Sequence, residues 1–316
     1  MKCPTHCATA ALAAAVVALL FSSGCNHSDT DRGSGDKGDD SDALVFASVP
    51  SQESANLQQS YQPILEMLTE ETGQEIRFMN ATDYDAIIKG LHDGEIDIAA
   101  VGPFSYVLAK WQGAQITVVA AQVEEKGEPP GYRSYGIALA GSPIKTLADF
   151  RSKTVCFVDP NSASGYLYPS AGLLTAGVNP EQDTTPRFVG GHDASVLAVA
   201  NRKCDAGFAF DTMVERQLIE QRQIQSGQIA TVWKSEVIPG APMVISNRLS
   251  PVLRQQLTTA IQQKANADYL RANDFCQGEC GIADDDAYGY VATNDAFYDS
   301  LREVCRIVRH ESCTER

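Results

Sequence analysis

The chain has 316 residues, of which 44% are hydrophobic and 21% are charged. This composition suits about two globular domains and excludes a disordered, collagen-like or polytopic membrane protein. The 40 acidic residues outnumber the 25 basic ones, which gives a net charge of -15 and a pI near 4.7. Such a surface repels phosphate backbones and anionic lipid, so nucleic acid and membrane surfaces are not expected partners. A small anion is still compatible with this charge, because backbone N–H groups can hold one in a pocket.

The first 25 residues have the pattern of an export signal. Lys2 precedes an apolar run over residues 8–21, and small residues follow the run. Fourteen helical residues span roughly 21 Å, less than the roughly 30 Å of a hydrocarbon core, so a permanent membrane anchor is the weaker alternative. The sequence therefore predicts export, with residues 1–25 removed or processed.

The end of this signal resembles a bacterial lipobox. Ser23 and Gly24 directly precede Cys25, which would be lipidated and become the mature N-terminus. Ser22 stands where leucine is usual, and simple cleavage to a free protein is the alternative. Residues 26–43 are rich in Gly, Ser and Asp and should form a flexible tether.

Six cysteines remain after the signal and Cys25 are set aside. An even number in an exported chain predicts disulfides. A zinc site is disfavoured because the last four cysteines lack CxxC spacing, and no metal or cofactor is expected. The six are Cys156, Cys204, Cys276, Cys280, Cys305 and Cys313.

Strands and helices alternate along the globular part. Residues 44–48 are predicted as a strand, and apolar residues recur at helical spacing from Leu57 to Leu68. A strand over 75–79, a helix over 84–92 and a strand over 97–101 follow. This βαβ order predicts parallel sheets flanked by helices. Ligands of such sheets bind beyond the carboxyl ends of the strands.

An internal repeat indicates two similar halves. Tyr84-Asp85-Ala86 precedes a helix and the strand opened by Asp97, and His192-Asp193-Ala194 precedes a helix and the strand opened by Asp205. Upstream, LVFASVPSQESAN from Leu44 parallels TVCFVDPNSASGY from Thr154. Four matches occur in the same order in both halves and are separated by nearly the same number of residues, which favours duplication over chance. Two lobes with facing helix starts could close on a ligand.

Five segments resemble the substrate-binding proteins of phosphonate, phosphite and phosphate ABC transporters. The segments are DYDAIIKGLHDGEIDIA from Asp83, PGYRSYGIAL from Pro130, DPNSASG from Asp159, GHDASVLAVANRKCDAG from Gly191 and WKSEVIPGAP from Trp233. The resemblance implies an α/β, two-lobed type II periplasmic-binding-protein fold, with a mainly parallel sheet in each lobe and the ligand between the lobes. The mostly helical region after Pro251 resembles the family only in placement.

The DPNSASG segment is suited to bind a tetrahedral oxyanion. Ser162, Ala163, Ser164 and Gly165 follow a strand and begin a helix, so their N–H groups and two hydroxyls can converge on one anion. The alternative is that the serines only cap the helix, and the resemblance favours binding. Pro169 fits either the first helical turn or a kink, which leaves the helix start open.

Tyr84 and His192 occupy equivalent positions of the repeat and are expected to donate to the anion from opposite lobes. Core packing is the alternative for Tyr84, and a helix cap or solvated loop is the alternative for His192. Ser48, Ser105 and Asp211 follow other strand ends or open a helix and are further candidates.

The ligand expected is phosphite, phosphate or an alkyl phosphonate. Family members that accept aminoalkyl phosphonates resemble one another in carrying carboxylates where this chain has Thr212 and Ala241. An ammonium group without a counter-charge would be costly to bury, although Asp211 is one residue away and could substitute.

The expected protein is an exported, lipid-anchored monomer that delivers its ligand to an ABC permease. It would lie in the periplasm or on the outer face of the cytoplasmic membrane. A ligand-presenting receptor for a membrane sensor is the first alternative. An exported phosphoester hydrolase is the second, but the chain has no GxSxG, HExxH or P-loop motif.

The expected domains are lobe 1, residues 44–137 plus 236–316, and lobe 2, residues 138–235. Cys156 and Cys204 are expected to pair, because one lies in the opening strand of lobe 2 and the other just before a neighbouring strand. Cys276–Cys280 and Cys305–Cys313 is the preferred pairing of the rest, although four cysteines allow three connectivities.

Overall fold

The computed structural model describes residues 43–278, 280, 282–283, 287–309 and 313. The expected signal, the expected lipidation residue Cys25 and the expected tether except its last residue, 43, lie outside this part of the chain. Among the residues described, no helix is both long and apolar enough to cross a membrane.

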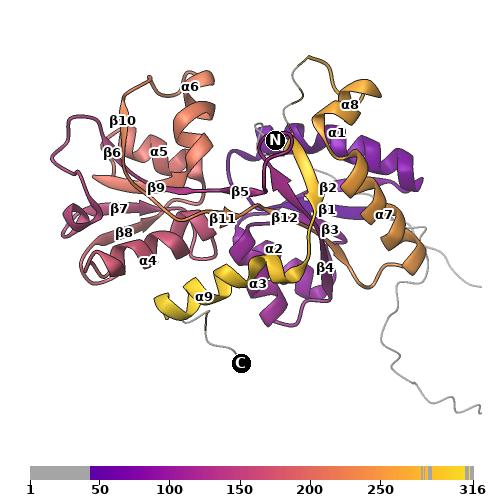
Figure 1. The fold of residues 1–316 in the computed structure, drawn as a ribbon, viewed down its shortest axis with the longest axis horizontal. Coiled ribbons are helices and arrows are strands. Elements are labelled where there is room, and N and C mark those ends of the chain that lie inside the picture. Colours follow the sequence, from indigo (N-terminus) through magenta and orange to yellow (C-terminus); the bar gives the residue numbers. More distant parts are fainter. Residues whose placement is uncertain (1–42, 279, 281, 284–286, 310–312, 314–316) are drawn as a thin grey trace, which may run out of the picture. The chain divides into compact units, whose positions relative to one another are not determined.

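Strands and helices alternate through most of the chain (Figure 1). The strands are β1 (Leu44–Ser48), β2 (Ile76–Asn80), β3 (Ile98–Ala100), β4 (Ile116–Val123), β5 (Gly131–Tyr132), β6 (Ser134–Leu139), β7 (Thr154–Phe157), β8 (Thr185–Phe188), β9 (Ala206–Phe210), β10 (Ile229–Lys234), β11 (Ile238–Pro239), β12 (Pro242–Ser246) and β13 (Gly289–Ala292). The helices are α1 (Ser54–Thr72), α2 (Tyr84–Asp93), α3 (Pro103–Trp111), α4 (Tyr168–Thr175), α5 (His192–Ala200), α6 (Leu218–Glu220), α7 (Pro251–Lys264), α8 (Ala267–Ala272) and α9 (Asp299–Val308). Short 3₁₀ or π turns are η1 (Leu147–Phe150), η2 (Ala163–Leu167), η3 (Met213–Gln217) and η4 (Asp295–Tyr298).

The strands form two larger sheets and one two-stranded ribbon. The first sheet has the order β13-β4-β12-β3-β1-β2, the second has the order β10-β6-β9-β7-β8, and β5 pairs with β11. The expected boundary at 137/138 falls inside β6, which pairs entirely within the second sheet. The chain therefore enters the second sheet directly after the ribbon strand β5 and leaves it just before β11.

The expectation of mainly parallel sheets is wrong in detail, because both sheets are mixed. β1 runs parallel to β2 and β3, and β7 runs parallel to β8 and β9. β12 and β13 join the first sheet antiparallel, and β6 and β10 do so in the second. Strands linked by βαβ units run parallel, whereas β6, reached from the ribbon, and β12, which returns from it, arrive without a crossover helix.

Local sequence explains where α2 begins and ends. The Asp83 carboxylate accepts the Ala86 N–H (2.8 Å), which caps the helix start. Gly94 ends the helix in the left-handed region at φ 75°, a conformation that glycine adopts without strain. Between these caps Ile87, Ile88 and Leu91 form a buried apolar stripe, as the predicted helix over 84–92 requires.

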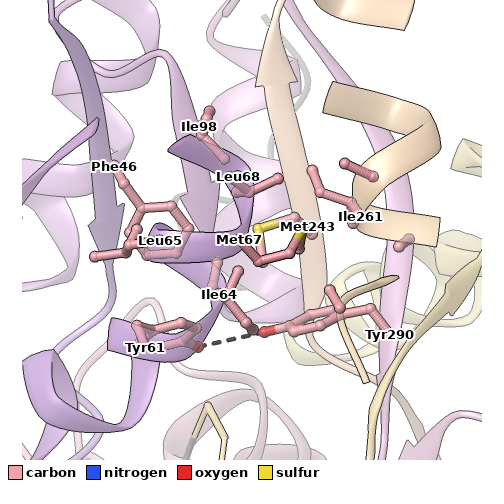
Figure 2. Close-up of a cluster of buried hydrophobic side chains, with 14 of the residues drawn as sticks. Phe46, Tyr61, Ile64, Leu65, Met67, Leu68, Ile98, Met243, Ile261 and Tyr290 are labelled. Atoms are coloured by element: carbon pink, nitrogen blue, oxygen red, sulfur yellow. Dashed lines mark hydrogen bonds between the residues drawn. The ribbon is translucent and has the colours of Figure 1, made fainter. Parts of the chain in front are cut away.

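The core of the first sheet joins segments far apart in sequence. α1 packs along α7, and both helices cover one face of the sheet (Figure 1). Figure 2 shows side chains from α1, the strands and α7 meeting in this core, where the hydroxyls of Tyr61 and Tyr290 lie 3.4 Å apart. Phe46 from β1 packs against Tyr61 with ring centroids 5.1 Å apart. The C-terminal region is thus needed to complete the core of the N-terminal strands.

The second sheet has its own apolar core and a disulfide. Phe157 stacks on Phe208 at a centroid distance of 5.4 Å, with Phe150 packed beside Phe208. Cys156 in β7 is joined to Cys204 before β9, with Cα atoms 5.9 Å apart, which is the pairing expected from the sequence. β7 and β9 are parallel neighbours, so the sheet brings the two cysteines together.

The remaining cysteines form the local pairs that were preferred. Cys276 is joined to Cys280 and Cys305 to Cys313. Helix α9 carries Cys305 and packs against both α3 and α4. The second of these disulfides therefore fastens Cys313 to a helix that packs against α3, beside the first sheet, and α4, beside the second.

Candidate functional site

A cavity of about 60 Å³ lies where the two sheets and the ribbon meet. Its lining residues come from the carboxyl ends of β1, β3, β4 and β9, from the starts of α2, α5 and η2, and from β5. A buried water needs roughly 10–15 Å³ on the same measure, so the cavity has room for roughly four to six water-sized groups. This matches a phosphate or methylphosphonate, each of which has five non-hydrogen atoms.

The start of η2 presents the expected donors. Ser162 caps this start, and its Oγ accepts the Gly165 N–H at 3.0 Å. Because that lone pair is used, the Ser162 hydroxyl hydrogen can be directed into the cavity. The amides of Ala163 and Ser164, as the first of the helix, have no acceptor one turn earlier. The Ser134 hydroxyl donates to the Ser164 carbonyl (2.6 Å) and so fixes this segment against β6.

Gly165 and Pro169 explain why the helix can begin so close to the sheet. A Cβ at Gly165 would lie 2.4 Å from the Val158 Cβ and 2.8 Å from the Ser162 Oγ, so only glycine fits. Pro169 has no N–H to donate to the Gly165 carbonyl one turn earlier, and that carbonyl instead accepts the Val158 N–H (3.2 Å). The result is the π turn η2 continued by α4, which settles the helix start that the sequence left open.

His192 is held as a neutral donor. It is 3% exposed, its ring packs on Phe210 (4.6 Å between centroids), and its Nδ1 accepts the Phe210 N–H at 3.2 Å. The ring proton is therefore on Nε2, which faces the cavity and lies 3.5 Å from the Ser162 Oγ. Burial away from water lowers the pKa of His192 to about 3. The imidazole can donate one hydrogen bond to an anion but brings no positive charge.

This pKa predicts an acid-sensitive contribution to stability. The unfolded chain protonates His192 near pH 6.5, whereas the folded chain does so only near pH 3. The contribution is fully present above pH 6.5 and is lost as the pH falls from there toward 3. Because asparagine does not titrate, we expect wild type to lose unfolding free energy relative to His192→Asn below pH 6.5, by up to about 1.4 kcal/mol per pH unit. Urea titrations at pH 7.5, 6 and 5 measure it, and a pH-independent difference would contradict it.

Residues of the first sheet form the opposite wall. Ser48 ends β1 and Tyr84 begins α2, and both are buried and line the cavity. Tyr84 and His192 are the first residues of α2 and α5, so the two repeat positions do face one cavity.

Several hydrogen bonds connect the elements of the two sheets around the cavity. The His192 N–H donates to the Ser51 carbonyl (2.8 Å), and the Asn161 Nδ2 donates to the Asp85 carboxylate (2.9 Å). The Asp159 carboxylate accepts the Tyr84 N–H, and burial, with the nearby acidic residues Asp85 and Asp83, raises the pKa of Asp159. These contacts hold the starts of α2, α5 and η2 together around the cavity.

Two of the expected site residues do not line the cavity. Ser105 is fully buried in the first turn of α3, and its hydroxyl donates to the Asn161 carbonyl (3.0 Å). Gly165 uses its N–H in the bond to Ser162, so this amide is not available to a ligand. The other candidates, Ser48, Tyr84, Ser162, Ala163, Ser164, His192 and Asp211, all line it.

Five polar residues of the wall were not predicted from the sequence. Ser51 follows β1, Tyr61 belongs to α1, Gln122 lies near the carboxyl end of β4, Glu124 follows that strand, and Tyr132 belongs to the ribbon. The available signal was that Gln122 is polar and follows the apolar stretch Val118 to Ala121 of its strand. Thr212 and Ala241, the positions considered for an ammonium group, also line the cavity.

The cavity is therefore polar but lacks a cation. Among the described residues that line it there is no Lys or Arg, while Glu124 and Asp211 are carboxylates. An anion here must be held by neutral donors and a helix start, which stabilise negative charge through N–H groups.

A polar cavity between two sheets, lined by hydrogen-bond donors at helix starts, has the geometry of the ligand site of a substrate-binding protein. The family model of the periplasmic substrate-binding protein of phosphonate ABC transporters matches residues 46–286. The phosphate-import protein PhnD of Mycolicibacterium smegmatis is 42% identical over 312 residues, covering 96% of this chain and 97% of that protein. The phosphonates-binding periplasmic protein of Escherichia coli is 30% identical over 219 residues, 68% of this chain and 64% of that protein.

Solved structures agree on the fold. A binding protein component of an ABC phosphonate transporter from Pseudomonas aeruginosa superimposes with a TM-score of 0.73 and 28% identity, over 84% of this chain and 86% of that one. PhnD1 from Prochlorococcus marinus, solved in complex with methylphosphonate, has the same fold. Its TM-score is 0.72 and its sequence identity 18%, over 86% of this chain and 99% of that one. The chain belongs to the periplasmic substrate-binding proteins of phosphonate ABC transporters, with the type II periplasmic-binding-protein fold. This family binds small phosphonate or phosphate ligands and works with an ABC permease.

Proposed function

We propose that this chain captures a small phosphorus oxyanion, either phosphite, phosphate or an alkyl phosphonate, and delivers it to an ABC permease. The observation that carries the proposal is the convergence of the η2 start and the neutral His192 on a cavity of about 60 Å³. Hydrogen bonds from neutral groups to a charged oxygen contribute about 1.5–3 kcal/mol each, so a few of them suffice for micromolar binding. The name of the mycobacterial relative, a phosphate-import protein, supports the same ligand class.

The ligand would be enclosed between two lobes. Lobe 1 would contain the first sheet and lobe 2 the second, with the crossing placed after β5 rather than at 137/138, and the return near residue 235. The hydrogen bonds from Asn161 to Asp85 and from His192 to Ser51 join the two sides, which supports a closed arrangement. The ribbon of β5 and β11 would then act as the hinge.

The expected preference against aminoalkyl phosphonates forms part of the proposal. Thr212 and Ala241 provide no counter-charge for an ammonium group at the two positions considered. The small volume supports the same preference, because an aminoethyl group adds three non-hydrogen atoms to phosphonate.

Lipid attachment and a monomeric state are further parts of the proposal. The lipobox-like end supports lipid on Cys25, which would hold a monomer at the outer face of the cytoplasmic membrane beside its permease. A catalytic role is not part of the proposal. His192 Nδ1 accepts a backbone N–H instead of contacting a carboxylate, so this residue is not arranged as the general base of a hydrolase.

Removing one hydrogen-bond donor from each proposed lobe tests the proposal. Ser164→Ala and Tyr84→Phe should each weaken phosphate or methylphosphonate binding by about tenfold to a hundredfold, because one hydrogen bond to a charged group is lost. Stability without ligand should change little, since water can reach these groups in an open cleft. Isothermal titration calorimetry on folded variants measures the affinity. Unaltered affinity in both variants would place the binding site elsewhere.

A further inference from the structure

The polar groups of the cavity divide into donors and acceptors. The donors are those of η2, His192 and Tyr84 described above. The acceptors are Gln122, Glu124 and Asp211, which we call the acceptor wall. A fully deprotonated oxyanion offers only acceptors, so it could satisfy the donors but not this wall.

Gln122 supplies an unpartnered acceptor. Its side-chain Nε2 donates to the Glu124 Oε1 at 3.2 Å, which orients the amide and leaves Oε1 as the free end. Gln122 is 6% exposed, and its buried Oε1 has no hydrogen-bond partner among the described residues. A buried acceptor without a donor costs about 1–3 kcal/mol, so this position favours a ligand that brings a donor.

Asp211 supplies a fixed negative charge. Its Oδ1 accepts the Thr212 N–H (3.1 Å) and its Oδ2 accepts the Arg133 N–H (3.0 Å), so the carboxylate is held rigidly. Burial raises the pKa of Asp211, whereas these two amides oppose the rise. Glu215 is the charged group that acts on Asp211, and the Arg133 guanidinium instead bonds the Ser235 carbonyl. Glu124, Tyr84, Tyr132 and neutral His192 line the same cavity.

The acceptors are held beside the same ribbon. The Asp211 N–H donates to the Arg133 carbonyl directly after β5, and the Gln122 N–H donates to the Ala241 carbonyl shortly after β11. β5 and β11 are paired, with Tyr132 opposite Ile238. The acceptor wall therefore lies at the ribbon end of the cavity, whereas the donors come from helix starts.

We propose that the acceptor wall, with Asp211 as its rigidly held carboxylate, accepts a hydrogen bond from the P–OH group of the ligand and so selects protonated phosphorus oxyanions over sulfate and sulfonates. The inference rests on the proposed function and names the form of ligand that this site takes. An O–H donor to a carboxylate makes a short, charge-assisted bond, whereas an unprotonated oxygen beside Asp211 is repelled. No proton is transferred in this step, since the ligand keeps its P–OH bond.

The pH dependence of two ligands separates this inference from simple anion binding. Methylphosphonate loses its P–OH near neutral pH, whereas phosphate keeps one P–OH well above it. We expect methylphosphonate affinity to fall by about tenfold per pH unit above its second ionisation, while phosphate affinity changes little between pH 6.5 and 9. Sulfate and methanesulfonate should bind at least about a hundredfold more weakly than phosphate at pH 7. Isothermal titration calorimetry with these four ligands measures each of the expected affinities.

Asp211→Asn is the decisive variant, and Asp205→Asn is its matched control. Both carboxylates flank β9 and accept a backbone N–H, Asp205 from Thr154 at 2.9 Å, but Asp205 is outside the cavity. Asparagine can still accept that N–H through its oxygen. In Asp211→Asn we expect the ratio of phosphate to sulfate affinity to shrink at least about tenfold and the methylphosphonate pH profile to flatten. Asp205→Asn should behave as wild type.

Three outcomes would overturn the inference while leaving oxyanion capture intact. These are sulfate binding as tight as phosphate in wild type, equal loss of all anions in Asp211→Asn, and aminoethylphosphonate binding tighter than methylphosphonate with the difference removed by Asp211→Asn. The last would make Asp211 an ammonium partner. Absence of binding for every oxyanion tested would instead refute the proposed function itself.

Discussion

Replacing His192 with alanine should weaken phosphate binding by about a hundredfold at pH 7. The variant loses the Nε2–H donor that faces the cavity, worth about 1.5–3 kcal/mol toward a charged oxygen. It also removes the ring that packs on Phe210 and leaves the Phe210 N–H without its acceptor. We therefore expect a loss of about 2–4 kcal/mol in the free energy of unfolding as well.

Two conservative variants separate these effects. In His192→Asn the Oδ1 can replace Nδ1 as acceptor for the Phe210 N–H, but no group reaches the Nε2 position. Stability near pH 7 should be largely retained, and binding should stay weak. In His192→Gln the Nε2 can reach the donor position without the bond to Phe210, so binding should recover more than stability. Calorimetric titration and urea unfolding measure the two quantities. Full affinity in His192→Asn would exclude His192 as a donor to the ligand.

Replacing Cys156 and Cys204 together with serine should lower the free energy of unfolding by about 4 kcal/mol. The bond closes a loop with a sequence separation of 48 residues, and its removal returns that loop entropy to the unfolded chain. Phosphate affinity at a temperature where the variant is folded should change less than about threefold, because both cysteines lie outside the cavity lining. Guanidinium unfolding at pH 7, with and without reductant for wild type, measures the change.

The short bridge between Cys276 and Cys280 provides the matched control. Its sequence separation is only four residues, so the same model assigns its removal about 2 kcal/mol. If the two double-serine variants lose equal stability, loop entropy does not explain the contribution of the longer bridge.

Much of the fold followed from patterns that are local in sequence. The Asp83 cap, the apolar stripe of α2 and Gly94 together define that helix before any tertiary contact is known. The mixed sheets were not predictable in the same way. Whether β6 and β12 run with or against their neighbours depends on how the chain crosses between sheets, and strand patterns carry no direction.

The sequence by itself determined the donor side of the proposed site, because donors at a helix start depend on residue type and short spacing. Ser162, Ser164 and His192 could be named because each lies at a helix start after a strand, and because the family resemblance, with the internal repeat for His192, favoured binding over capping. Only the tertiary structure decided which groups remain for a ligand. It commits the Gly165 amide to Ser162 and fixes the His192 tautomer through Phe210. It also brings Gln122, Glu124 and Asp211 to one cavity from strands nearly ninety residues apart. Hydrogen bonds and burial between distant segments create that arrangement, and no short segment of sequence encodes it.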